Sequence, residues 1–150
     1  MKFKTRELSL QNLIGFSLSL EPKEDFFERL SKDSKVFKIQ MIENGFYTDG
    51  PIFYQYNPQK EEQDVLVFTT VGNKLELRGE NRSNIFFQES LDLITDFYYR
   101  HYDQEEPIPY DEIEEKISTL GYKLIDIIHV ILDLYGDKVI DLYCEVEKIK

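Results

Sequence analysis

The sequence predicts an α+β protein in which duplicated β-α-β-β units form an antiparallel sheet with helices on one face. Three observations lead to this prediction. Residues 121–147 read as two long apolar strands joined at Gly136-Asp137. Helical spacing of apolar residues precedes this hairpin and also follows the first strand. The order strand, helix, glycine, strand, strand occurs twice, with Gly45 and Gly121 at corresponding positions, which is typical of a duplication.

Length and composition indicate one domain, residues 1–150, made of two repeats of about 1–73 and 80–150. A chain of 150 residues that is 41% hydrophobic can bury a sizeable core. The single cysteine excludes an internal disulfide framework. No apolar run approaches the roughly 18 residues of a membrane-spanning helix, and the first residues lack a signal-peptide pattern. We therefore expect a cytoplasmic protein with no membrane partner.

The net charge of −11 limits the class of partner. An acidic surface repels the phosphate backbone, so no nucleic-acid partner is expected. The same charge favours a cationic ligand or a basic protein surface, although ordinary solubility also accounts for it.

In the first half, the alternation of apolar residues over 14–20 predicts a strand within 4–20. A helix is expected to begin at Pro22. Residues 36–44 favour a helix that ends at Asn44-Gly45, with a short strand over 37–41 as the alternative. Residues 52–56 and 64–71 then read as a hairpin with a long loop.

In the second half, residues 84–89 are strand-like. Leu91, Ile94 and Tyr98 share one helical face, so residues 90–102 are interpreted as a helix, with a strand as the open alternative. Helical spacing resumes over 110–120 and ends at Gly121.

In the terminal hairpin, a two-residue loop near Gly136 assigns every residue to one of two faces. The first face carries Ile127, His129, Ile131, Asp133, Ile140, Leu142, Cys144 and Val146. The second carries Ile128, Val130, Leu132, Leu134, Val139, Asp141, Tyr143 and Glu145. Both faces are too apolar for open solvent, so one is expected to pack on helices. The other would be a pocket or an interface, and in the second case the protein would form a homodimer.

These features resemble the GyrI-like small-molecule-binding domain family, which includes effector-binding domains of bacterial multidrug-sensing regulators. The resemblance rests on the duplicated order, on Gly50-Pro51 leading into IFYQY, and on the terminal hairpin with alternating carboxylates and Tyr143. It implies a groove between the two halves that binds hydrophobic, often cationic molecules, with aromatic walls and an acidic residue. The sequence departs from the regulators because it has no DNA-binding domain and no tryptophan, so a stand-alone domain is expected.

Six residues are candidates for contact with a small hydrophobic or cationic ligand. They are Tyr54, Tyr56, Val130, Asp141, Tyr143 and Glu145. An aromatic ring beside a carboxylate in an apolar groove binds a flat cation, which makes Tyr143 and Glu145 the preferred pair. The alternatives are a solvated strand end for Glu145 and ordinary cross-strand packing for the tyrosines of the first hairpin.

No motif specifies a reaction, so an enzyme is not the preferred interpretation, and no cofactor is expected. His129 and Cys144 share a face and would suit a nucleophilic pair, but a buried histidine beside a buried thiol is the simpler interpretation. His101 is expected at the surface, and the sparse histidines and cysteine predict no metal site. The alternative functions are an accessory or immunity-type module that binds a basic protein, and a hydrolase that uses Glu145.

Overall fold

The computed structural model describes residues 2–19, 35, 36, 39, 43, 50–57, 64–72, 85–102, 107–134 and 136–149. Its elements, in chain order, are β1 (Lys4–Ser19), β2 (Ile52–Tyr56), β3 (Asp64–Thr70), β4 (Ile85–His101), α2 (Tyr110–Thr119), β5 (Tyr122–Leu134) and β6 (Asp137–Lys148). The helix expected from Pro22 lies outside the described residues. Of the segment 36–44, only residues 36, 39 and 43 are described, and each is helical.

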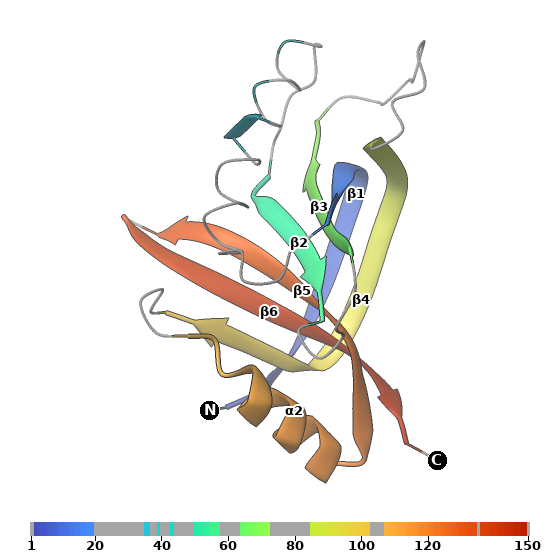
Figure 1. Ribbon diagram of the computed structural model, residues 1–150, viewed down its shortest axis with the longest axis vertical. Coiled ribbons are helices and arrows are strands. Elements are labelled where there is room, and N and C mark those ends of the chain that lie inside the picture. Colours follow the sequence, from blue (N-terminus) through green and yellow to red (C-terminus); the bar gives the residue numbers. More distant parts are fainter. Residues whose placement is uncertain are drawn as a thin grey trace.

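The strands form a closed antiparallel barrel in the order β1-β3-β2-β5-β6-β4 (Figure 1). β4 closes the ring by pairing along most of β1, from Lys4–Tyr98 to Phe16–Ile85. The predicted α+β sheet with helices on one face is therefore wrong. Because the sheet closes on itself, one of its faces lies inside the barrel and can be filled only by the strands' own side chains.

The strand order has the symmetry that a duplicated unit would produce. β3 pairs with β1 and β2, and β6 pairs in the same way with β4 and β5. The two halves then meet through antiparallel β1–β4 and β2–β5 pairs. The second half has the expected order of strand, helix, strand and strand. That the halves are repeats stays a prediction, and this topology agrees with it.

β4 runs from Ile85 to His101, so the strand that was the open alternative to a helix over 90–102 is confirmed. Its pairing with β1 is irregular between Lys4 and Arg6, so that Arg6 lies opposite Thr95 and Lys4 opposite Tyr98. The Thr95 hydroxyl donates to the Cys144 carbonyl at 2.6 Å and accepts the Phe97 amide at 3.0 Å, which fixes this bulge. Beyond it, β4 bends sharply and continues as the partner of β6 (Figure 1).

Two apolar clusters lie on the two faces of β5 and β6. The inner cluster fills the barrel with Leu8, Leu13, Phe53, Phe68, Tyr98, Ile128, Val130 and Tyr143. The outer cluster packs beneath α2 and contains Phe97, Ile108, Ile113, Ile117, Leu124, Ile127, Ile140, Leu142 and Cys144. The apolar stripe of α2 thus buries Ile113 and Ile117 completely against β5 and β6.

The terminal hairpin has the predicted register. Leu134 pairs with Asp137, which leaves a two-residue loop in which Gly136 adopts a φ of +90°, and Ile128, Val130 and Leu132 lie opposite Tyr143, Asp141 and Val139. One face lies under α2, as expected, and the other lies inside the barrel. Since both faces are covered within one chain, the apolar face that suggested a homodimer is not exposed.

Candidate functional site

Three of the six predicted ligand residues lie together on the inward face of β5 and β6. Val130 and Tyr143 are each 5% exposed and belong to the inner cluster, and Asp141 is 2% exposed. Tyr143 packs against the Tyr98 ring at a centroid distance of 5.1 Å. Glu145 is only half-buried and pairs with Asp126 at the β5–β6 bulge. The preferred pair of Tyr143 and Glu145 therefore spans a buried position and a partly solvated one.

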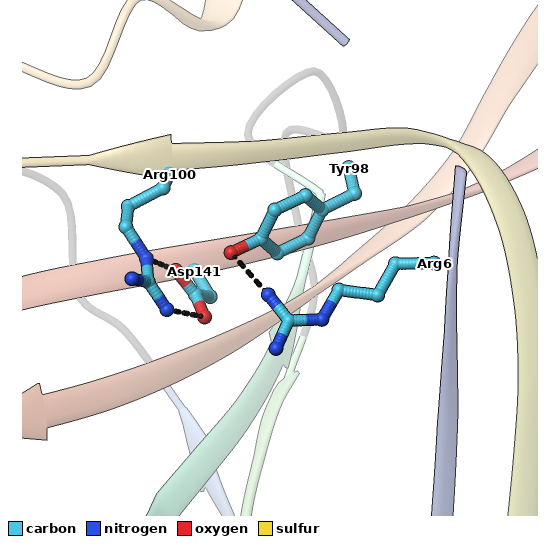
Figure 2. A network of polar contacts seen from close by, with 4 residues as sticks. All are labelled: Arg6, Tyr98, Arg100 and Asp141. Atoms are coloured by element: carbon cyan, nitrogen blue, oxygen red, sulfur yellow. Dashed lines mark hydrogen bonds and ion pairs between the residues drawn. The ribbon is translucent and has the colours of Figure 1, made fainter. Parts of the chain in front are cut away.

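Asp141 is the acceptor of a polar network that crosses three strands (Figure 2). Arg100 on β4 donates two parallel hydrogen bonds to its carboxylate, at 2.6 and 2.9 Å. Arg6 on β1 donates to the Tyr98 hydroxyl at 2.8 Å, with its guanidinium 4.8 Å from the centre of the Tyr98 ring. Burial, followed by the hydrogen bond to Asp141, raises the pKa of Tyr98 to about 12. The Tyr98 hydroxyl thus accepts a hydrogen bond from Arg6 and feels the negative charge of Asp141.

The sequence predicted that a ligand cation would lie against an aromatic ring and a carboxylate on this face. The chain's own arginines take that position. Asp141 already has the bidentate partner that carboxylates prefer, and a planar guanidinium already lies against an aromatic ring. A ligand cation would have to displace Arg100 or Arg6. The sequence singles out neither arginine. A helix over 90–102 gives no reason to place Arg100 near Asp141, whereas β4 pairs the two directly.

Tyr54 and Tyr56 lie on the opposite, outward face, so the structure does not bring them together with Tyr143. They gather around His129, where β2 pairs with β5. The Tyr54 ring stacks on the imidazole with centroids 4.2 Å apart, Tyr56 lies at 6.3 Å, and Tyr110 from the first turn of α2 at 5.9 Å. This group, Tyr54, Tyr56, Tyr110 and His129, is called the tyrosine cluster below.

The hydrogen bonds of His129 define its tautomer. Nδ1 lies 3.2 Å from the carbonyl oxygens of Tyr54 and Ile127, which only accept, so Nδ1 carries the proton. Nε2 then accepts from the Tyr110 hydroxyl at 2.9 Å. Burial lowers the pKa of His129 to about 3 and raises that of Tyr110, so both side chains are neutral at pH 7. The cluster therefore presents aromatic rings and no ionised group.

Cys144 does not form a reactive pair with His129, and His101 is buried. Cys144 lies across from Ile127, whereas His129 lies across from Leu142, and burial raises the pKa of the thiol to about 12. The expectation that His101 is at the surface is wrong, because it is 5% exposed at the end of β4. Within the described residues, no group of three or more acidic, histidine or cysteine side chains is arranged to hold a metal ion.

A pocket of about 510 Å³ opens between α2 and the start of β5. Its walls are mainly apolar and are formed by Asn57, Glu114, Ser118, Tyr122, Lys123, Leu124, Ile125 and Ile149. The Asn57 amide donates to the Ile125 carbonyl at 2.9 Å, which ties the end of β2 to the pocket wall. Glu114 contributes a carboxylate. The pocket thus combines apolar surface with a few polar groups, as small-molecule sites do.

The pocket and the tyrosine cluster lie along the same side of α2. Tyr110, Glu114 and Ser118 are four residues apart, so they form one stripe on the helix, with Tyr110 over His129 and the other two in the pocket. Asn57 directly follows Tyr56 on the facing strand. Glu114 was not among the residues predicted from the sequence, although its four-residue spacing from Tyr110 places the two on one face of a helix.

Comparisons with known proteins give a fold but no family. No family model matches the sequence, and no curated protein matches it. The C-terminal domain of EcmrR is similar in structure, with a TM-score of 0.62 at 16% identity over 99% of this chain and 100% of that domain. EcmrR in its complex with DNA gives a TM-score of 0.59 at 15% identity, covering 98% of this chain and 58% of that chain.

At these identities the likeness shows the fold alone, which this chain shares with the C-terminal domain of EcmrR. The expectation of no nucleic-acid partner stays a prediction. No helix of the described residues has the length and apolar character needed to cross a membrane.

Proposed function

We propose that this chain is a small-molecule-binding domain that takes hydrophobic cations into the pocket between α2 and β5. The pocket itself is the observation that supports this most directly. Its volume of about 510 Å³ lies within the range of roughly 300–1,000 Å³ for drug-sized ligands. The structural likeness to the EcmrR C-terminal domain agrees with this function at the level of fold.

The chemistry of the walls favours a cation with apolar groups. Glu114 supplies a negative charge, and Tyr122 supplies an aromatic ring whose face attracts cations. Lys123 also lines the pocket but is exposed, so its ammonium can remain in water while its stem covers apolar surface. The net charge of −11 raises the local concentration of cations around the whole molecule.

The tyrosine cluster extends this surface toward the junction of the two halves. Tyr56 is only half-buried, lies next to Asn57 of the pocket wall, and has its ring centre 6.3 Å from that of His129. In this proposal Tyr56 guides the aryl groups of a ligand, while Val130, Asp141 and Tyr143 support the barrel from inside. Glu145 lies on the other face and has no role in this pocket.

A thermal-shift titration tests the proposal. Tetraphenylphosphonium is the cationic probe, and triphenylphosphine oxide, a neutral aryl compound, is its comparator. At a hundredfold excess over its dissociation constant, a ligand specific for the native state raises the melting temperature by about 5–10 °C. We expect this rise with the cation and a much smaller one with the neutral compound. No rise with either compound would contradict the proposal.

Neighbouring residues of α2 offer a matched control. Glu114→Gln removes the pocket carboxylate, whereas Glu115→Gln removes the same charge from an exposed residue outside the pocket lining. We expect Glu114→Gln to weaken cation binding about three- to tenfold, because solvent screens the attraction between a partly exposed carboxylate and a cation. Glu115→Gln should change it less than twofold. Equal effects of the two substitutions would mean that the net negative charge of the protein attracts the cation and that the pocket does not bind it specifically.

A further inference from the structure

We infer a second site, for a small oxyanion such as a phosphate or carboxylate group, at Arg6 and Arg100. The two guanidinium groups reach toward each other from β1 and β4, with Asp141 between them (Figure 2). Together with Tyr98 and Tyr143 they are called the arginine cluster. It lies on the inward face of the barrel wall, separate from the pocket beside α2.

The charge balance of the arginine cluster favours an anion. Two guanidinium groups face one carboxylate, which leaves one positive charge in excess within a chain of net charge −11. Arg100 forms an ion pair with Asp141, whereas Arg6 forms no ion pair with any of the described residues. The nearby acidic residues of β4 point outward, where Asp92 and Asp96 accept hydrogen bonds from Ser9 and Thr5. Their carboxylates are therefore directed away from the cluster.

The guanidinium donors of the cluster are more exposed to solvent than the carboxylate of Asp141. The Asp141 side chain is 3% exposed, whereas that of Arg100 is 27% exposed and Arg6 is an exposed residue. A guanidinium has five N–H donors, and Arg6 gives one of them to the Tyr98 hydroxyl. Its remaining donors are available for the bidentate geometry that carboxylates and phosphates accept.

The cluster is also held in place before any ligand arrives. The Tyr98 hydroxyl and ring fix Arg6, and the paired hydrogen bonds to Asp141 fix Arg100. An arginine that is already ordered loses less side-chain entropy when it binds an anion. The ring of the buried Tyr143 packs against that of Tyr98 at a centroid distance of 5.1 Å, which holds Tyr98 in place as well.

Titration with inorganic phosphate and, separately, with acetate tests this site and distinguishes the two oxyanion classes. The readouts are melting temperature and the NMR signals of the arginine Nε–H groups, with sodium chloride at matched ionic strength as reference. We expect one of the two anions to raise the melting temperature by about 3 °C when its concentration is about ten times its dissociation constant. The same anion should shift the Arg6 signal. The anion that saturates at lower concentration identifies the class. Responses equal to those in chloride would overturn the inference.

Arg6→Gln is the decisive variant, because Arg6 is exposed and its loss leaves the Arg100–Asp141 pair in place. Lys148→Gln, at the exposed far end of β6, where it pairs with Tyr122, removes the same charge and serves as control. We expect Arg6→Gln to weaken anion binding at least tenfold and Lys148→Gln less than twofold. Equal weakening would overturn the inference. Glu114→Gln should leave anion binding unchanged, so this site and the cation pocket can fail independently.

Discussion

His129 makes the stability of this fold depend on pH in a way that can be calculated. Its imidazole is completely buried, and the protein supplies a neutral environment of two carbonyls, a tyrosine hydroxyl and aromatic rings. Burial lowers its pKa to about 3, from 6.5 in the unfolded chain. Below pH 6.5 the unfolded state binds a proton that the folded state excludes, so acid favours unfolding.

The sign and size follow from this difference in pKa. The contribution is fully present above pH 6.5 and is lost as the pH falls toward 3. Between pH 7 and pH 5 the folded protein keeps His129 neutral while the unfolded chain becomes mostly protonated. The free energy of unfolding should therefore decrease by about 2 kcal/mol from this residue alone, at close to 1.4 kcal/mol per pH unit once below 6.5.

Urea unfolding at pH 7 and pH 5, for wild type and for His129→Gln, isolates this contribution. Glutamine offers an amide donor and acceptor but does not titrate, and every other titrating group is common to both proteins. We expect the wild type to lose about 2 kcal/mol more than the variant over this interval. Equal losses in the two proteins, or an imidazole that titrates near pH 6.5 by NMR in the folded protein, would refute the reasoning.

Three further predictions concern the two arginines near Asp141 and the buried thiol of Cys144. Arg100→Met should lower the free energy of unfolding by about 2 kcal/mol in a urea titration, since it leaves Asp141 buried without its ion pair, and the partial exposure of Arg100 reduces the full penalty. Arg6→Met should cost less than about 1 kcal/mol, and a larger loss for Arg6 than for Arg100 would contradict this ranking. Cys144 should not react with a thiol reagent in the folded state at pH 8, because it is completely buried and its pKa is raised to about 12. Modification as fast as in urea would disprove this.

Periodicity in the sequence identified the terminal hairpin well because both strands are regular over most of their length. Its loop, register and faces agree with the prediction, since alternation fixes which residues share a face once the loop is placed. The same approach failed in β4. There the bulge at Thr95–Phe97 shifts the alternation, so that Leu91, Leu93 and Tyr98 all contact the inner cluster.

That shift produces helix-like spacing in a strand. Leu91 and Tyr98 are seven residues apart, which suits two turns of a helix, but Ile94 between them is 72% exposed. A helical face would have buried it. The fold class was wrong for a related reason. Local alternation shows that a strand has two distinct faces, but closure depends on the long-range pairing of β1 with β4, which no local pattern encodes.

Closure of the barrel also determines which part of the predicted site can meet a ligand. An inward carboxylate in a narrow barrel must be paired by the chain itself, because an unpaired buried charge would cost several kcal/mol. Asp141 therefore recruits Arg100, and the polar residues expected to bind a cation become part of the barrel's own structure. The cation pocket instead lies on the outer surface, where α2 leaves a cavity beside β5 and where Glu114 can face a cation without being fully buried. Arg100 stays 27% exposed in this pair and Arg6 is exposed beside it, so a face predicted to attract cations is better suited to an anion.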